Sequence, residues 1–360
     1  MALNETMAEA LRLTRSGNLM EATALLQAAL GSGDAISPKG ATTVRAIWPE
    51  QGLLGAPGAV GPDAAARPAA QARQPDRRAS FEERICRTSQ GAMSYWLYRP
   101  ANVAANVPLV VMLHGCTQSP QDFARGTGMN LLADERGFIV AYPQQNPAAN
   151  PQKCWNWFRP GDQQRDRGEP AQLAAITRQI IAEQGVDPKR VSIAGLSAGG
   201  AAAAIMAAQY PDLYSAVGIH SGLACGAARD LPSALAAMQR GAATKPTGPG
   251  NPSFVPLITF HGDRDATVNE VNSREIVAAA SVAAGRALTV RLEKGCSKSG
   301  RFYTRAQSVD PSGTVLIEQW TIEGQGHAWS GGDRSGSYTD PSGPEASRAM
   351  VEFFLTRKRA

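Results

Sequence analysis

Residues 191–204 read VSIAGLSAGGAAAA, and this stretch decides the fold. A short β-branched segment runs into a Gly-x-Ser-x-Gly turn centred on Ser197, and an alanine-rich segment follows it. A nucleophilic serine of the elbow type requires a strand, a tight glycine turn and a helix in this order. The neighbours of Ser197 are small because larger side chains would collide with the flanking strand and helix. The stretch therefore predicts a nucleophile at Ser197.

A phosphate-binding loop or a purely structural turn is the alternative for these glycines. Neither Gly-Lys-Ser nor Gly-x-Gly-x-x-Gly follows the strand, so the pattern disfavours a nucleotide site. The serine turn remains the better interpretation.

Short apolar segments alternate with helical segments on both sides of this turn. The alternation predicts an α/β fold with a mainly parallel sheet and helices on both faces. Strands are expected at residues 93–100, 108–115, 137–143, 190–193, 214–222, 255–262 and 288–294. Helices are expected at residues 169–185, 269–284 and 343–357.

Composition divides the chain into three predicted parts. Residues 1–31 carry leucines and alanines at helical spacing around a Ser-Gly-Asn break, which indicates a short helical hairpin. Residues 32–79 are rich in Ala, Pro and Gly and are expected to form a flexible linker. Residues 80–360 are long enough for one α/β catalytic domain.

The composition also disfavours several classes of function. A net charge of +5 with scattered basic residues and no interleaved aromatics argues against nucleic-acid binding. No apolar run reaches the length of a membrane span. The five cysteines contain no Cys-x-x-Cys pair, which argues against a zinc site. We therefore expect no metal, no cofactor, no nucleic-acid partner and no membrane span.

A nucleophilic serine needs a histidine base, and the chain has four histidines. In the α/β order of such sites the acid follows the serine, and the histidine follows the acid on a late loop. His327 lies in the glycine-rich segment EGQGHAWSGG and comes after both acids of the segment GDRDATV. We predict His327 as the base, and the other histidines as structural or pocket-lining groups.

The acid is either Asp263 or Asp265. Asp263 directly follows a glycine and is expected to form an Asx turn within its own loop. Asp265 precedes a small residue, a threonine and Val268, which can pack the loop under the sheet. We therefore predict Asp265 as the acid.

The oxyanion of the reaction needs two backbone N–H donors. One is expected from Ala198, directly after the nucleophile, and the other from Cys116 in the segment LHGCTQS. Cys116 is better explained as a backbone donor than as a nucleophile, and its thiol is a candidate for a structural pair with Cys154.

Five segments resemble a known family: HGCTQ, CWNWF with the later RGEP, GLSAGG, HGDRDATV and GHAWSGG. Over residues 80–357 the chain resembles the polyhydroxybutyrate (PHB) depolymerase-like esterases, which are α/β-hydrolases related to feruloyl and acetylxylan esterases. The resemblance implies a serine esterase with Ser197, Asp265 and His327 as triad. It also implies an extracellular protein, whereas the first residues, MALNETMAEALRLTR, predict no secretory signal.

Tryptophans belong to the same segments, and we predict that Trp155, Trp157 and Trp329 bind the substrate as an exposed apolar platform. The alternative is that CWNWF only packs a long loop. Short-chain hydroxyalkanoate esters or oligomers are the expected substrates. Feruloyl or acetylxylan-type esters, and a non-catalytic binding protein with a hydrolase fold, are the alternatives.

Overall fold

The computed structural model describes residues 9, 12, 78–242 and 254–359. The chain divides into two units, Met1–Asp76 and Arg77–Ala360. Apart from residues 9 and 12, the predicted helical hairpin lies outside the described residues, and so does nearly all of the predicted linker. The architecture described below is that of the second unit.

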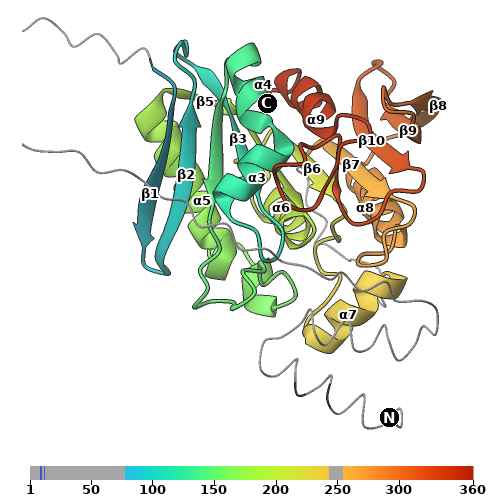
Figure 1. Ribbon diagram of the computed structural model, residues 1–360, viewed down its shortest axis with the longest axis horizontal. Coiled ribbons are helices and arrows are strands. Elements are labelled where there is room, and N and C mark those ends of the chain that lie inside the picture. Colours follow the sequence, from blue (N-terminus) through green and yellow to red (C-terminus); the bar gives the residue numbers. More distant parts are fainter. Residues whose placement is uncertain (1–8, 10–11, 13–77, 243–253, 360) are drawn as a thin grey trace, which may run out of the picture. The chain divides into compact units, whose positions relative to one another are not determined.

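Ten strands of the second unit form one sheet (Figure 1). Their spatial order is β1 (Ser80–Thr88), β2 (Gly91–Arg99), β4 (Ile139–Pro143), β3 (Val107–Leu113), β5 (Val186–Leu196), β6 (Ala216–His220), β7 (Leu257–Gly262), β10 (Val315–Ile322), β9 (Phe302–Val309) and β8 (Thr289–Cys296). The neighbours from β4 to β10 are parallel, and the pairs at both ends of the sheet are antiparallel. The sheet is therefore parallel at its centre.

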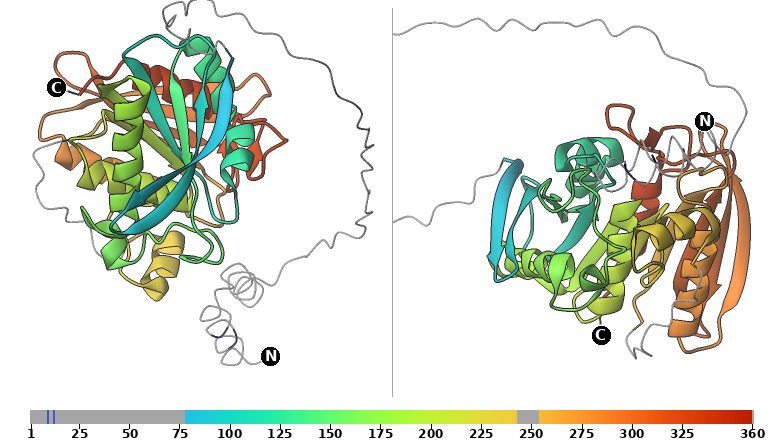
Figure 2. Two further views of the ribbon diagram at one scale, coloured as in Figure 1. Left: turned by 90° about the vertical axis from the view of Figure 1, so that its left-hand side faces the viewer. Right: turned by 90° about the horizontal axis from the view of Figure 1, so that it is seen from below.

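Helices cover both faces of this sheet. They are α3 (Pro120–Thr127), α4 (Met129–Arg136), α5 (Gly168–Gln184), α6 (Ala198–Gln209), α7 (Leu231–Arg240), α8 (Val271–Ala283) and α9 (Ala346–Leu355), with the short η1 (Pro160–Gln163). Figure 2 shows α4 and α9 on one side of the sheet and α5 and α6 on the other. Two short strands, β11 (Trp329–Ser330) and β12 (Thr339–Asp340), pair outside the main sheet.

The two helical layers determine which strands of the sheet are buried. Every residue of β3, β4, β6 and β7 is buried, as expected for parallel strands that are covered on both faces. The strands consequently read as continuous apolar runs rather than as alternating ones. The predicted α/β-hydrolase fold, with a mainly parallel sheet between two helical layers, is confirmed.

The topology brings the predicted site residues to one edge of the sheet. Cys116, Ser197, Asp265 and His327 follow β3, β5, β7 and β10, which are mutually parallel. Parallel strands end at the same edge, where open α/β sheets bind their ligands.

Candidate active site

Ser197 lies at the turn between β5 and α6. Its backbone has φ 58° and ψ −121°, a conformation that a residue with a side chain adopts only when its surroundings impose it. A Cβ on Gly199 would overlap the carbonyl oxygen of Leu113 in β3, and a Cβ on Gly195 would overlap the backbone of Gly199. The packing of the turn therefore requires both glycines of the motif, and it holds Ser197 in a strained position at the end of the strand.

His327 and Asp265 form a hydrogen-bonded pair. The Nδ1–H of His327 donates to Oδ2 of Asp265 at 2.7 Å, and Oδ1 of Asp265 accepts the backbone N–H groups of Thr267 and Val268 at 2.9 and 2.8 Å. Burial by itself would raise the pKa of Asp265, but the hydrogen bond and charge of His327, with the charge of His261, lower it. The carboxylate is therefore ionised at neutral pH, and Nε2 is the nitrogen of His327 that can take a proton.

Asp263 has a different role in the same loop. Its Oδ1 accepts the backbone N–H of Gly324 at 2.7 Å, which ties the loop after β7 to the loop that leads to His327. The expected Asx turn at Asp263 is wrong, because the N–H of Asp265, two positions ahead, bonds the carbonyl oxygen of Gly262 instead. Of the two candidate acids, Asp265 is the one in contact with His327.

His220 connects the serine turn to the segment of the base. Its carbonyl oxygen accepts the N–H of Ser197 at 2.9 Å, and its Nε2 accepts the N–H of Ser330 at 2.9 Å. The ring of Trp329 stacks on the imidazole with centroids 5.0 Å apart. Burial lowers the pKa of His220 well below its ordinary value, so the ring is neutral, as its acceptor role requires. The serine turn and the segment just after His327 are thus joined through one buried residue.

The loop after β3 packs against the serine turn. A Cβ built on Gly115 would lie 3.7 Å from the Cβ of Ser197. The next residue, Cys116, forms a disulfide with Cys154, so its thiol is structural. Within residues 78–242 and 254–359, the backbone N–H groups of Cys116 and Ala198 donate to no acceptor. An oxyanion requires two such donors; Ala198 directly follows the serine, and Gly115, next to Cys116, packs against it.

A buried glutamate organises the segment that begins at this disulfide. Glu169, at the start of α5, accepts the backbone N–H and the side-chain amide of Asn156 at 2.8 and 2.6 Å, and the side-chain amide of Gln145 at 2.5 Å. The amide of Gln145 also donates to the carbonyl oxygen of Cys154 at 2.9 Å. Burial, and then the negative charge of Asp162, raises the pKa of Glu169 to about 7.

His114 links this network to Gly115. Its Nε2 accepts the N–H of Gln145 at 3.2 Å, its Nδ1–H donates to the carbonyl oxygen of Gly115 at 2.7 Å, and its own carbonyl accepts from Trp155 at 3.0 Å. Burial lowers the pKa of His114 to about 4, so the ring is neutral. Glu169 was not among the predicted site residues. The RGEP segment of the sequence contains Glu169, but the groups that donate hydrogen bonds to its carboxylate lie elsewhere in the chain.

The predicted aromatic platform is wrong as a set of exposed side chains. Trp155 is 0% exposed, Trp329 is 1% exposed and Trp157 is 7% exposed. The indole N–H of Trp155 bonds the carbonyl of His114, and that of Trp329 bonds Oγ of Ser347 at 3.0 Å. Burying an indole is favourable when its N–H finds such an acceptor. These tryptophans therefore pack the loops that carry the site, which was the alternative interpretation of CWNWF.

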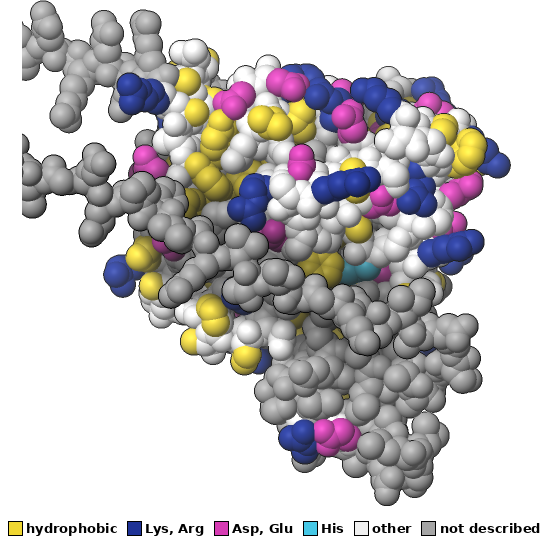
Figure 3. Space-filling model, in the orientation of Figure 1, with side chains coloured by type: hydrophobic (Ala, Val, Ile, Leu, Met, Phe, Trp, Pro, Cys, Tyr) yellow, Lys and Arg dark blue, Asp and Glu magenta, His cyan; other side chains and the backbone are white. Residues whose placement is uncertain are grey.

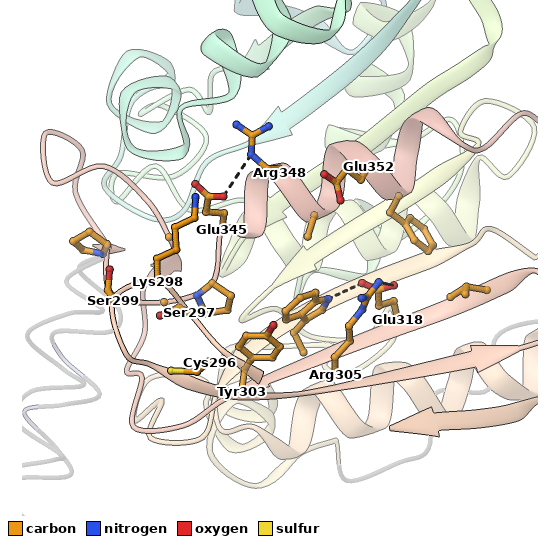
Figure 4. A pocket seen from close by; sticks show the side chains of 18 of the residues that line it. Cys296, Ser297, Lys298, Ser299, Tyr303, Arg305, Glu318, Glu345, Arg348 and Glu352 are labelled. Carbon is orange, nitrogen blue, oxygen red and sulfur yellow. Dashed lines mark hydrogen bonds and ion pairs between the residues drawn. The ribbon is translucent and has the colours of Figure 1, made fainter. Parts of the chain in front are cut away.

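A cleft of about 570 Å³ lies between α9 and the strands β9 and β10 (Figure 4). Glu318 accepts hydrogen bonds there from Trp320 at 2.7 Å and from Arg305 at 3.0 Å, and Arg348 lies 3.5 Å from Glu345. The residues that line this cleft include none of the predicted catalytic residues. Charges of both signs line this cleft, and the ion pairs Arg305–Glu318 and Arg348–Glu345 lie within it, so the cleft indicates no particular class of ligand.

The surface of the second unit carries charges of both signs. Figure 3 shows Lys and Arg interspersed with Asp and Glu over the described surface of one face. None of the helices among the described residues is long and apolar enough to cross a membrane. In the same part of the chain, no three His, Cys, Asp or Glu side chains are grouped so that they could hold a metal ion.

The fold and the strained serine turn define an α/β-hydrolase, and comparison with known proteins identifies the family. Residues 93–288 match the family described as "Esterase PHB depolymerase". The chain belongs to this family of carboxylic ester hydrolases. The matched range includes Ser197 and Asp265 and ends before His327.

The individual relatives that resemble this chain are likewise named as a depolymerase and an esterase. The chain is 32% identical over 250 residues to poly(3-hydroxyalkanoate) depolymerase C of Paucimonas lemoignei, covering 67% of this chain and 59% of that one. It is 35% identical over 136 residues to acetylxylan esterase of Coprinopsis cinerea, covering 37% of this chain and 36% of the relative. The chain therefore spans less than two thirds of the length of either relative.

A solved structure supports the fold alone. The acetyl xylan esterase from Aspergillus awamori superimposes with a TM-score of 0.57 at 21% identity, covering 68% of this chain and 94% of the other.

Proposed function

We propose that this chain is a serine esterase that hydrolyses carboxylic esters through an acyl-enzyme on Ser197. The observation that carries the proposal is the 2.7 Å hydrogen bond from Nδ1–H of His327 to Asp265, made between loops that follow different strands. That bond fixes the tautomer in which Nε2 of His327 can act as a base. The link through His220 between Ser197 and the segment of the base supports the same assignment.

In the first step, Oγ of Ser197 attacks the ester carbonyl carbon while its proton passes to Nε2 of His327. The carbonyl π electrons move onto oxygen, which the N–H groups of Cys116 and Ala198 stabilise, each contributing on the order of 10²–10³ in rate. Asp265 stabilises the imidazolium that forms. The intermediate then collapses, and the leaving alcohol takes the proton from His327.

In the second step, water attacks the acyl group on Ser197 and gives a proton to His327. The new intermediate expels Oγ of Ser197, which regains its proton from His327, and the carboxylic acid leaves. The same two amides serve both intermediates, so the loop that carries the disulfide acts twice in each turnover.

Short-chain hydroxyalkanoate esters or oligomers are the proposed substrates. Support comes from the name of the depolymerase relative and from the extent of the similarity, which is 67% of this chain. Acetylated xylan or feruloylated carbohydrate is the second candidate, supported by a relative that matches a shorter part of the chain.

A panel of substrates separates these candidates. We expect the full chain to hydrolyse p-nitrophenyl acetate and butyrate and 3-hydroxybutyrate oligomers with a higher kcat/KM than acetylated xylan or methyl ferulate. Ser197→Ala serves as the matched control for every substrate. A preference for xylan or ferulate would favour the second candidate, and equal inactivity of both proteins on all esters would favour the non-catalytic alternative.

A further inference from the structure

Strand β8 forms one edge of the ten-stranded sheet, and its outer side pairs with no described strand. Figures 1 and 2 show it at the extreme of the sheet, beyond β9. Seven of its eight residues are exposed, including Leu292 at 72% and Val290 at 58%. An edge strand of this kind presents a row of free backbone N–H and C=O groups.

Three devices that often block such an edge are missing from β8, although the strand does carry charged side chains. The strand has eight residues, contains no proline and keeps an unbroken register with β9 from Thr289 to Cys296. Prolines, bulges and very short strands are common protections of an edge. The alternation of side chains places Val290, Leu292 and Lys294 on one face and Arg291 and Glu293 on the other. The edge is therefore unbroken, partly apolar and unpaired with any described strand.

The charges on β8 are complementary to those of a second β8. Two antiparallel copies related by a two-fold axis pair symmetrically about the residue on that axis. With Leu292 on the axis, Arg291 lies opposite Glu293 of the second copy, and this pair occurs twice. Moving the axis to Arg291 or to Glu293 places like charges opposite each other, which is destabilising. Of the registers centred on Arg291, Leu292, Glu293 or Lys294, only the one centred on Leu292 keeps like charges apart and also pairs Arg291 with Glu293.

We propose that β8 is an interaction surface for a second copy of this chain, and that the two strands pair antiparallel with Leu292 at the centre. The pairing satisfies the free backbone groups of both edges and brings the two exposed Leu292 side chains together. Opposite charges face each other across the interface, and such cross-strand pairs stabilise antiparallel sheets.

Charge reversal tests this register directly. Arg291→Glu places two glutamates opposite each other, and Glu293→Arg places two arginines opposite each other. We expect the full chain to dimerise in sedimentation velocity over a concentration series, and each single variant to dimerise at least about tenfold more weakly. An equimolar mixture of the two variants should form a heterodimer, because every cross-strand pair is then Glu with Arg. The double variant should dimerise like the unchanged protein.

A matched control separates this effect from a general change of charge. Arg87→Glu reverses an exposed arginine on β1, the opposite edge, and should leave the dimer unchanged. Glu293 also lies 3.4 Å from Arg305 of β9, so thermal melts of each variant establish that it is folded. A wild-type protein that stays monomeric would overturn the proposal, as would a dimer that both single variants leave intact or a mixture that fails to associate.

Discussion

Asp265 and Glu169 are two buried carboxylates with opposite surroundings. Asp265 faces His327, an imidazole that can become a cation, and the interaction lowers its pKa although burial would raise it. Glu169 faces the neutral amides of Asn156 and Gln145, and burial raises its pKa to about 7. A carboxylate that stabilises a transient positive charge must be ionised, whereas one that only orders amides needs acceptor oxygens. The difference separates a proposed catalytic group from a positioning group.

The largest expected effect is that of Asp265→Asn. An amide at this position favours the imidazole tautomer that cannot accept the proton of Ser197, so kcat should fall by about 10³–10⁴. KM for p-nitrophenyl butyrate should change little, because the ester does not contact this side chain in the proposed mechanism. Steady-state kinetics with active-site titration would measure both, and a fall in kcat of less than tenfold would remove Asp265 from the triad.

Glu169→Gln should have a smaller effect through the oxyanion loop. One acceptor oxygen becomes an amide donor that faces the donors of Asn156 or Gln145, so a buried pair is lost at about 1–3 kcal/mol. We expect kcat to fall by about 10–100-fold with a nearly unchanged KM, since the amide of Cys116 shifts relative to the oxyanion. Glu83→Gln, at an exposed position on β1, is the matched control. A lower melting temperature with a normal kcat per folded enzyme would make Glu169 purely structural.

The two carboxylates should also differ in the pH dependence of stability. Glu169 has a folded-state pKa of about 7, above its ordinary value of 4.5, so the native state binds more protons between these values. Stability from this group is present below pH 4.5 and is lost as the pH rises through 7, in total about 3 kcal/mol. Asp265 has the opposite sign, because its lowered pKa contributes stability above its ordinary pKa and loses it as the pH falls.

Urea unfolding of wild type and Glu169→Gln between pH 4.5 and 7 would measure the first of these two slopes. As the pH rises from 4.5 to 7, the free energy of unfolding of wild type should fall relative to that of Glu169→Gln. A constant difference across this range would contradict the raised pKa of Glu169.

The smallest expected effect is that of Asp263→Asn. The amide oxygen can still accept the N–H of Gly324, so the loop tie is kept and kcat should stay within about threefold of wild type. The same kinetic assay checks this value. If Asp263→Asn were more damaging than Asp265→Asn, the two carboxylates would have to exchange roles.

Sequence patterns predicted the central parallel strands and the serine turn, because short stretches of sequence determine both. Buried parallel strands read as apolar runs. The glycines around Ser197 are required because a Cβ on Gly199 would overlap β3 and a Cβ on Gly195 would overlap the backbone of Gly199. The contact between Asp265 and His327 was also expected, since chain order and parallel strand ends restrict which residues can meet.

Other parts could not be predicted because they depend on long-range contacts. Strands β9 and β10 were not among the expected ones, although β10 pairs in parallel with β7 and leads to the loop of His327. The burial of Trp155 and Trp329 is decided by acceptors that lie 41 and 18 residues away in the chain. The sequence around a loop tryptophan does not indicate whether the indole faces solvent or a buried carbonyl oxygen.

Covalent labelling by a fluorophosphonate tests the assignment of Ser197 most directly, because the reagent reports an activated serine without a choice of substrate. Ser197→Ala removes one hydroxyl and leaves the turn unchanged, so its melting temperature should equal that of wild type. We predict one label per wild-type chain, located on Ser197 by mass spectrometry, slow labelling of Asp265→Asn and none of Ser197→Ala. Stoichiometric labelling of the folded Ser197→Ala variant would contradict this assignment and place the nucleophile elsewhere.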